Sequence, residues 1–416
     1  MGKSRSREVK VLSLNTWTDP ERLMERTEAV AQGILKLDPA IACLQEVTSP
    51  RVKKLLRQRL SSRYHIVSTD HTNLTFPALA WIPAVLFALV VGGGLAFFST
   101  GLGHTVAWAL VAVCTAALSP TGLNYILRCA LVRQKGDPMT LDGMFPSVDL
   151  MGQCVLVRRQ DQDQDQDQDG TARADAGWFA AEAVAVEPFP SWLRGYPMPP
   201  TVWQWPNYWM QHCFFRPGCF VVRCRHARRH EEMLVASAHL VVSAPHTSVN
   251  PYRIQQVKYL DRVIASSLAQ CGDAAGAGGG GGHGDGASRC VICCGDFNAP
   301  DGSAEVSWMC GAGDYIDTAA AGNAVSPHPR FLTWDSALNS NTKSDPDEPD
   351  ARLDYVFARP SLDIDVGSVR RVFDGAETPI VSDHFGVLST VVIRPKNSPA
   401  TATRSRSRNG SRSKQK

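Results

Sequence analysis

Six short segments of this 416-residue chain place polar side chains at or beside a predicted β-strand. In the runs that form the predicted strands, apolar residues alternate with polar ones or are often β-branched, as is typical of strands. The runs span residues 9–14, 41–44, 234–238, 291–294, 353–357 and 387–393. Between the first two runs, apolar residues at helical spacing predict a helix over residues 21–37. Because polar strand ends commonly meet at one edge of a layered fold, we expect a sheet sandwich with its active site along that edge.

The polar residues beside these strands are mainly carboxylates, amides and histidines. In chain order they belong to Asn15, Gln45-Glu46, Ala238-His239-Leu240, Gly295-Asp296-Phe297-Asn298, Arg352-Leu353-Asp354-Tyr355-Val356-Phe357 and Ser382-Asp383-His384. Each is weak evidence alone, because Asn15 could cap a turn, Glu46 could cap the following helix and Asp296 could order a loop. Their number and order together favour an active site.

These residue types suit metal-assisted hydrolysis of a phosphate ester. A hard cation that keeps several waters needs only one or two protein oxygen ligands, and Glu46 helped by Asn15 fits that role. A water that attacks phosphorus must be oriented and deprotonated, which suits a histidine whose second ring nitrogen is held by a carboxylate. His384 and Asp354 supply such a pair, and Asp296 is placed to position the water.

Hydrogen-bond donors must also face the phosphate oxygens, where negative charge builds in the transition state. Asn298 and His239 can donate there, and Asn15 can assist them as a phosphate ligand. Arg352 either contributes to the site or only pairs with a neighbouring carboxylate at the surface.

The order of the motifs, ending in Gly-Asp-Phe-Asn, Arg-Leu-Asp-Tyr and Ser-Asp-His, resembles the endonuclease/exonuclease/phosphatase superfamily. That superfamily includes pancreatic-type deoxyribonuclease, abasic-site endonucleases, inositol polyphosphate 5-phosphatases and neutral sphingomyelinases. The resemblance covers about residues 9–74 and 133–395. It implies an α/β (α+β) fold, a four-layered α/β/β/α sandwich of two packed mixed β-sheets. It also implies hydrolysis of a phosphate ester with Mg²⁺, or alternatively Mn²⁺, and places Asp383 beside the metal or its water shell.

An uncharged segment interrupts this catalytic domain. No Asp, Glu, Lys or Arg occurs between His71 and Arg128, and two apolar stretches at residues 76–98 and about 106–127 are each long enough to span a bilayer. Basic residues flank the segment on both sides, which predicts that both ends face the cytosol. We expect an inserted transmembrane hairpin, with a re-entrant or peripheral hairpin and a buried soluble helix pair as the alternatives.

The predicted organisation therefore has four parts. Residues 1–74 and 133–396 form the catalytic domain, residues 75–132 form the hairpin, and residues 397–416 form a basic disordered tail. Low-complexity insertions at 160–169 and 276–282 are flexible surface segments without chemistry. The basic tail either binds anionic lipid or nucleic acid or only aids solubility.

Composition agrees with a folded chain whose catalytic part lies in the cytosol. Hydrophobic residues make up 44% and charged residues 20% of the sequence, close to ordinary globular usage. The 12 cysteines lack the regular spacings of a zinc site or disulfide scaffold, so reduced, buried thiols are expected. The N-terminal apolar run is too short and too quickly interrupted for a signal peptide.

The substrate is not determined by these motifs, because this superfamily fold serves nucleases, lipid phosphodiesterases and phosphatases alike. The hairpin favours a phospholipid, and the aromatic segment 203–209 suits a lipid interface, although it could instead stack on a base or pack under the hairpin. Asn250-Pro251-Tyr252-Arg253 with Gln256, and Thr378-Pro379, are similar to neutral sphingomyelinases.

Two features depart from the sphingomyelinase pattern. The hydrophobic segments are internal rather than terminal, and the loop Phe215-Arg216-Pro217-Gly218 lacks a lysine of that pattern. A membrane-anchored endonuclease or exonuclease acting on DNA or RNA is the leading alternative, although the net charge of +3 is modest for one. An inositol-phosphate phosphatase is the next alternative, and a membrane-anchored scaffold built on an inactive enzyme fold is the last.

Overall fold

A computed structural model describes most of the predicted catalytic domain. The described residues are 7–19, 21–69, 73–74, 148–149, 152–159, 180–189, 217–225, 232–242, 250–276, 289–325, 331–342, 349–359 and 364–393. The predicted hairpin, the insertion at 160–169, the aromatic segment 203–209 and the basic tail lie outside these residues, as does nearly all of the insertion at 276–282. Among the helices that the described ranges contain, none is both long enough and apolar enough to cross a membrane.

The first large sheet combines the N-terminal and C-terminal parts of the chain. Its strands, in spatial order, are β12 (Asn323–Val325), β14 (Ile364–Val372), β15 (Gly386–Ile393), β1 (Arg7–Asn15), β2 (Ile41–Gln45), β6 (Cys154–Arg158) and β3 (Tyr64–Ser68). β1 pairs with β2 in parallel and with β15 in antiparallel orientation, so the sheet is mixed. The two ends of the catalytic domain are therefore joined by backbone hydrogen bonds at the centre of one sheet.

The second large sheet comes mainly from the middle of the chain. Its strands, in spatial order, are β11 (Ile316–Asp317), β13 (Asp354–Arg359), β10 (Arg289–Asp296), β9 (Glu232–His239), β8 (Gly218–Arg225) and β7 (Ala180–Pro188). β9 and β10 run parallel, whereas β10 and β13 run antiparallel. β4 (Asn73–Leu74) and β5 (Val148–Asp149) form a separate two-stranded ladder.

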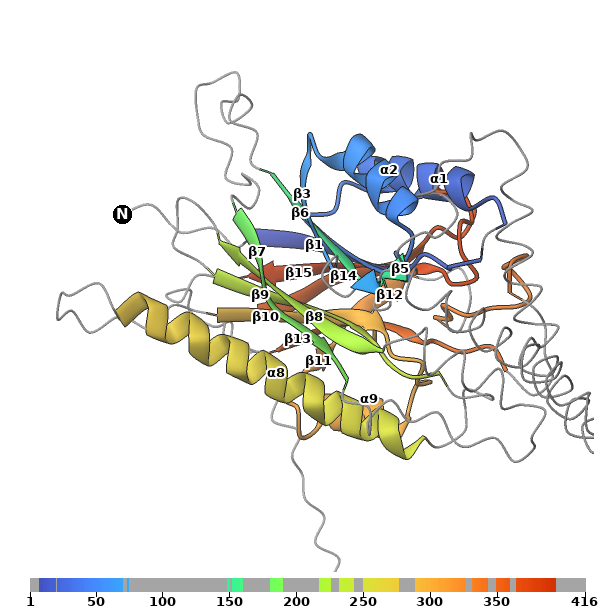
Figure 1. The fold of residues 1–416 in the computed structure, drawn as a ribbon. Coiled ribbons are helices and arrows are strands. Elements are labelled where there is room, and N and C mark those ends of the chain that lie inside the picture. The colour runs from blue at the N-terminus through green and yellow to red at the C-terminus, as the bar shows by residue number, and fades with distance from the viewer. Residues whose placement is uncertain are drawn as a thin grey trace, which may run out of the picture.

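Helices cover the outer faces of both sheets (Figure 1). α1 (Leu23–Leu37) and α2 (Pro50–Leu60) lie on the first sheet, while α8 (Pro251–Gly276) and α9 (Ala304–Cys310) lie on the second. The short α10 (Thr318–Ala321) connects β11 to β12. The structure thus confirms the predicted sandwich of two packed mixed sheets flanked by helices.

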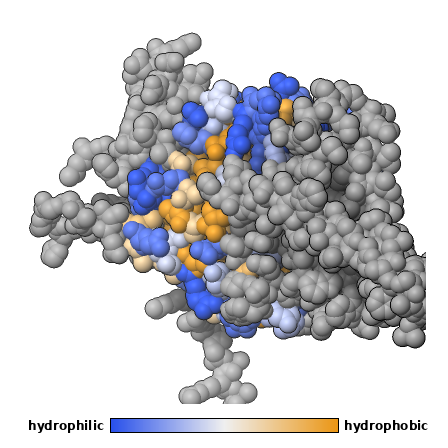
Figure 2. Space-filling model, in the orientation of Figure 1, coloured by the Kyte–Doolittle hydropathy of each residue, from blue (hydrophilic) through white to orange (hydrophobic). Residues whose placement is uncertain are grey.

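Three apolar clusters fill the spaces between the layers. One lies between the two sheets and contains Val11, Cys43, Val235 and Ile292, all fully buried. The others lie under the helices, where α1 and α2 bury Val30 and similar side chains, and α8 and α9 bury the second sheet. On the side shown in Figure 2, hydrophobic side chains also reach the surface between hydrophilic ones.

The cysteines in the described ranges belong to this core. Eight of the nine are buried, the exception is Cys310, and all nine are free thiols. Burial raises the pKa of the Cys290 thiol to about 12, so it stays protonated at neutral pH. Within these ranges the prediction of reduced, buried thiols is confirmed.

The strand directions explain why the polar motifs meet. β1, β2, β9 and β10 end at the edge of the sandwich where β13 and β15 begin. In the second sheet, Asp296 is in register with both His239 and Asp354, and in the first sheet Asn15 is in register with Gln45. The predicted convergence of the motifs on one edge is therefore a consequence of the topology.

Leu12 provides a test of the packing against α1. Its side chain is fully buried in β1, so Leu12→Ala is expected to lower the free energy of unfolding by about 2–5 kcal/mol through lost burial and a residual cavity. Leu338→Ala makes the same chemical change at a side chain that is 38% exposed and should cost about 0.5 kcal/mol or less. Urea unfolding measures both, and equal effects would contradict the described packing.

Candidate active site

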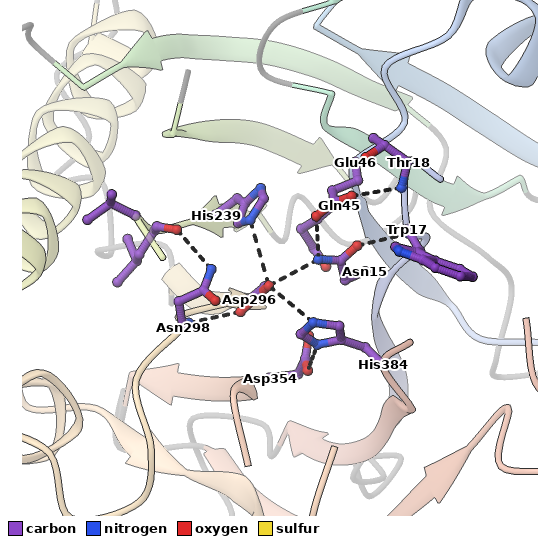
Figure 3. A network of polar contacts seen from close by, with 12 residues as sticks. Asn15, Trp17, Thr18, Gln45, Glu46, His239, Asp296, Asn298, Asp354 and His384 are labelled. Carbon is purple, nitrogen blue, oxygen red and sulfur yellow. Dashed lines mark hydrogen bonds and ion pairs between the residues drawn. The ribbon is translucent and has the colours of Figure 1, made fainter. Parts of the chain in front are cut away.

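Asp296 lies at the centre of the polar edge (Figure 3). It is the last residue of β10 and only 1% exposed. Its Oδ2 atom accepts a hydrogen bond from Asn15 Nδ2 at 3.0 Å and lies 3.7 Å from His239 Nε2 and 3.8 Å from His384 Nε2. A single carboxylate oxygen therefore faces groups from β1, from the end of β9 and from the turn before β15.

His384 and Asp354 form the predicted dyad. His384 Nδ1 lies 2.8 Å from Asp354 Oδ2, and both side chains are buried. The hydroxyl of Thr333 accepts hydrogen bonds from the backbone N–H groups of Leu353 and Asp354, and Ser382 Oγ accepts one from the N–H of His384. The dyad is held from both sides, with His384 Nε2 directed at Asp296.

The charges of this pair are strongly coupled. Burial opposes a charged imidazole, but Asp354 and Asp296 outweigh it and raise the pKa of His384 well above its ordinary value. Burial also raises the pKa of Asp354, against the opposing effect of His384. Asp354 and Asp296 therefore make His384 a stronger base than a free imidazole.

Asn15 joins Asp296 to the predicted metal ligand Glu46. Its side-chain amide donates to Glu46 Oε1 and to Asp296 Oδ2, both at 3.0 Å, while its Oδ1 accepts from the N–H of Trp17. Glu46 Oε2 accepts from the N–H of Thr18 at 2.8 Å. Glu46 and Trp17 have positive φ values of 62° and 58°, so both turns adopt left-handed backbone that packing must hold.

Asp383 lies beside these carboxylates. Burial raises its pKa to about 7, with further raising by the charges of Glu46 and Asp296 and lowering by His384. Ser382 donates to Asp383 Oδ1 at 3.2 Å, and Thr342 fixes its backbone by donating to its carbonyl at 2.6 Å. A carboxyl group in such surroundings is most readily ionised when a cation lies next to it.

The donor set fits a hard divalent cation. Glu46 and Asp383 offer carboxylate oxygens, and Gln45 Oε1 is buried without a hydrogen-bond partner among the described residues. Asp296, Asp354 and His384 also bring ligand atoms within 4.8 Å of one another. Because His384 and Asp354 are already hydrogen-bonded to each other, we assign those two to proton transfer and the cation to Glu46 and Asp383.

The two predicted hydrogen-bond donors to the phosphate differ in their exposure and in the hydrogen bonds that they already make. His239 is partly exposed, and its ring can reach a bound phosphate. Asn298 is buried, has a φ of 48°, and its amide already donates to the carbonyl of Leu240 at 3.0 Å. The second hydrogen on Nδ2 remains available to a phosphate oxygen. The role of Asn298 as a phosphate ligand stays a prediction, and it requires the loop after β10 to keep this conformation.

Several supporting residues were not assigned roles from the sequence. Arg253 on α8 is 1% exposed, pairs with Glu305 at 3.1 Å and donates to the carbonyl of Asn298. Trp334 lies edge-on to His384, with ring centroids 5.0 Å apart. The motif of Arg253 stood out in the sequence, but only the fold shows what the two side chains contact.

Arg352 does not occupy the surface position considered for it. Its side chain is buried and pairs with Asp317 at 2.6 Å and with Asp301, away from the dyad. It also lies over the ring of Tyr355, 4.5 Å from the centroid. The carboxylate pairing is therefore present, but inside the protein, because Arg352 lies just before β13 and its partner Asp317 is the buried N-cap residue of α10.

Metal binding gives a direct test of Glu46. A cation that binds the folded state stabilises it by about 2.7 kcal/mol when its concentration is 100 times its Kd. We expect millimolar MgCl₂ to raise the melting temperature relative to EDTA, and Glu46→Gln to remove most of that rise. Glu28→Gln alters a carboxylate on α1 that pairs with Arg59 and should keep it. A full Mg²⁺ response in Glu46→Gln would refute the assignment.

Comparison with known proteins gives one family and a set of distant structures. The model of the endonuclease/exonuclease/phosphatase family matches residues 12–384. Similar structures include TDP2 from C. elegans, 14% identical with a TM-score of 0.45, where the match covers 92% of this chain and 75% of that chain. D. rerio TDP2 complexed with single strand DNA product is 14% identical, with a TM-score of 0.46 and coverages of 92% and 98%.

An endonuclease/exonuclease/phosphatase family protein from Bacteroides thetaiotaomicron is 13% identical, with a TM-score of 0.47 and coverages of 94% and 100%. No curated protein matches this chain in sequence.

Proposed function

The chain belongs to the endonuclease/exonuclease/phosphatase family and is a metal-dependent phosphoric ester hydrolase, and we propose that it is a membrane-tethered, Mg²⁺-dependent phospholipid phosphodiesterase of neutral sphingomyelinase type. The observation that carries the chemistry is the contact of His384 Nδ1 with Asp354 at 2.8 Å, which directs His384 Nε2 toward Asp296.

The residues divide the reaction between them. His384, oriented by Asp354, accepts a proton from the attacking water, and Asp296 fixes that water by hydrogen bonding. His239 and Asn298 donate to the phosphate oxygens as their charge grows, with Asn15 assisting. When bound at Glu46 and Asp383, Mg²⁺ supplies positive charge that stabilises the phosphate in the transition state.

The lipid assignment rests on what surrounds the site in sequence. The two uncharged apolar stretches between His71 and Arg128 would hold the active site at a bilayer, which raises the effective substrate concentration. The flanking basic residues support an orientation with the catalytic domain on the cytosolic side, and the basic tail would add attraction to anionic lipid.

The α8 motif also supports a sphingomyelinase-like site. Asn250, Arg253 and Gln256 belong to the segment that resembles neutral sphingomyelinases. Asn250 Oδ1 accepts a hydrogen bond from the N–H of Tyr252 at the start of α8, and the other two residues contact segments beside the site. Arg253 binds the carbonyl of Asn298, and Gln256 Oε1 accepts from the N–H of Val241 at 3.0 Å.

Product analysis tests the proposal. The detergent-purified full chain is incubated with sphingomyelin micelles, with DNA or with inositol phosphates, in Mg²⁺ or in EDTA. Phosphocholine, nucleotide and inorganic phosphate products are measured. We expect phosphocholine only with sphingomyelin and Mg²⁺. Cleavage of DNA alone would replace the lipid assignment with a membrane-anchored nuclease, and release of phosphate from inositol phosphates alone would make the protein a phosphatase.

A further inference from the structure

A wide groove opens beside the active site. It has a volume of about 800 Å³, within the usual range of small-molecule sites, and Asp383 forms part of its wall. The described part of the wall comes from the β1–α1 connection, the N-terminal half of α1 and the loops that carry Trp334 and Asp383. None of the residues assigned to proton transfer or phosphate binding needs this space, so it is available to the rest of the substrate.

Two tryptophans of this groove contact residues of the active site. Trp334 lies edge-on to the ring of His384, and the N–H of Trp17 donates to Asn15 Oδ1 at 2.9 Å. Both side chains are partly exposed, so part of each indole faces the groove. A group that is covalently attached to a phosphate in the active site can therefore reach these aromatic surfaces.

Trp17 already binds a cation on one side. The guanidinium carbon of Arg26 lies 4.5 Å from the centroid of the Trp17 ring. The same guanidinium donates to the carbonyls of Thr16, Trp17 and Val381 at 3.0–3.2 Å. The guanidinium of Arg26 is thus occupied by contacts within the protein. Its position over the Trp17 ring shows that the indole surface here accepts positive charge.

The charges of the described wall are predominantly negative. Beside the cation ligand Asp383 it contains three further carboxylates, Asp19, Glu21 and Glu25, and two guanidinium groups, Arg22 and Arg26, but no lysine. Arg22 pairs with Glu25 at 2.8 Å. A second phosphate or a nucleic-acid backbone would meet repulsion there, whereas a positively charged group would meet indole rings and carboxylates together.

The contact of the groove residue Trp334 with His384 bears on which ester group of the substrate enters the groove. Water that His384 activates must approach phosphorus opposite the leaving group, and Trp334 packs against His384. Because Trp334 joins the groove to His384 and the proposed reaction leaves the head group on the phosphate, we take the groove to receive that retained group.

We infer that this groove is a subsite for a cationic head group, a quaternary ammonium or protonated amine joined to the retained phosphate by a short linker. The inference rests on the proposed function, because it takes the phosphate to be held by the residues described above. It selects zwitterionic phosphodiesters over nucleic acids and inositol polyphosphates.

Binding can test this without catalytic turnover. Phosphocholine and 3,3-dimethylbutyl phosphate have the same shape and differ by the charge of one atom. In calorimetric titrations of the full chain with Mg²⁺, we expect phosphocholine to bind about tenfold more tightly, in the range of a cation held by indole rings and carboxylates. Equal affinities, or no detectable binding of either compound at millimolar concentration, would overturn the inference.

Variants locate the preference within the groove. Trp334→Leu and Glu21→Gln should each reduce the ratio of the two affinities severalfold, and the ratio cancels any effect on phosphate binding itself. Glu21 is exposed, so its variant should fold normally even if Trp334→Leu does not. Glu28→Gln, on the same helix but outside the groove wall, should leave the ratio unchanged.

An unchanged ratio in both groove variants would assign the preference elsewhere and refute this subsite. A charge preference in binding combined with absent sphingomyelin hydrolysis would leave the subsite standing and reject the proposed reaction. The two conclusions can therefore fail separately.

Discussion

Replacing His384 with alanine is expected to lower kcat for phosphate-ester hydrolysis by about 10³-fold or more, in line with loss of a positioned general base. His384 is buried, is held by Asp354 at 2.8 Å and points its other nitrogen at Asp296, so the substitution removes the histidine that a carboxylate orients toward the water position. Steady-state kinetics in saturating Mg²⁺ measure the loss, and circular dichroism checks that the fold remains.

Three further variants make this prediction specific. Asp354→Asn should lower kcat by a comparable factor, and the double variant should lose little more than either single one, because the pair acts as a unit. His65→Ala changes a histidine on β3, outside the site, and should keep nearly full activity. If the His384→Ala protein kept more than about a tenth of the native rate, the role assigned to His384 as base would be wrong.

Gly295→Ala is expected to have the largest effect on stability, a loss of about 4–5 kcal/mol or more in the free energy of unfolding, enough to prevent folding of a marginally stable domain. Gly295 has a φ of +146°, and a Cβ there would lie 1.8 Å from the carbonyl oxygen of Ala238. That oxygen belongs to the backbone of β9, with which β10 pairs in parallel, so it cannot move aside without breaking the sheet beside Asp296 and His239.

Gly302→Ala separates the two causes. Gly302 also has a positive φ, +75°, but a Cβ there would meet nothing within 4 Å. Its replacement should therefore cost only the backbone strain, about 1 kcal/mol. Soluble expression and urea unfolding compare the variants. Similar losses at both positions would mean that backbone conformation, and not the close approach of β9, dominates at Gly295.

The sequence predicted the parts of the fold in which local pattern and tertiary role agree. β1, β2, β9, β10, β13 and β15 were expected within a few residues because buried strands give apolar runs that end at polar motifs. The helix expected over residues 21–37 begins two residues later than predicted, at Leu23. The convergence of Asn15, Glu46, Asp296 and His384 followed from the same pattern, since the chain order of the motifs matched a known arrangement.

Other elements had no comparable local signal. In β14 the apolar residues are interrupted by Asp365, by Gly367-Ser368 and by two adjacent arginines, and pairing with β15 and β12 specifies the strand. α8 runs for 26 residues, but its apolar positions become sparse toward its end, and the motif at its start suggested a function more than a helix. The burial of Arg352 was also not predictable, because its partners Asp301 and Asp317 are distant in sequence.

The contacts of Trp334 and Arg253 were also not predictable from the local sequence. The motif of Arg253 was noticeable in the sequence, but the role of each residue depends on which active-site residue the fold brings to it. Trp17 is similar, because only the hydrogen bond to Asn15 and the contact with Arg26 connect it with the site. A pattern of residue types predicts chemistry well and specificity poorly, since specificity depends on contacts between loops.

The most direct test of the reaction is hydrolysis in H₂¹⁸O of the phosphodiester that the protein cleaves fastest. Attack of water on phosphorus, with His384 as base, predicts one ¹⁸O atom in the phosphate product, none in the released alcohol, and no turnover in EDTA. The His384→Ala protein should release labelled product at a rate reduced by about 10³-fold. Label in the alcohol, or equal rates with Mg²⁺ and with EDTA, would contradict a metal-dependent attack of water at phosphorus.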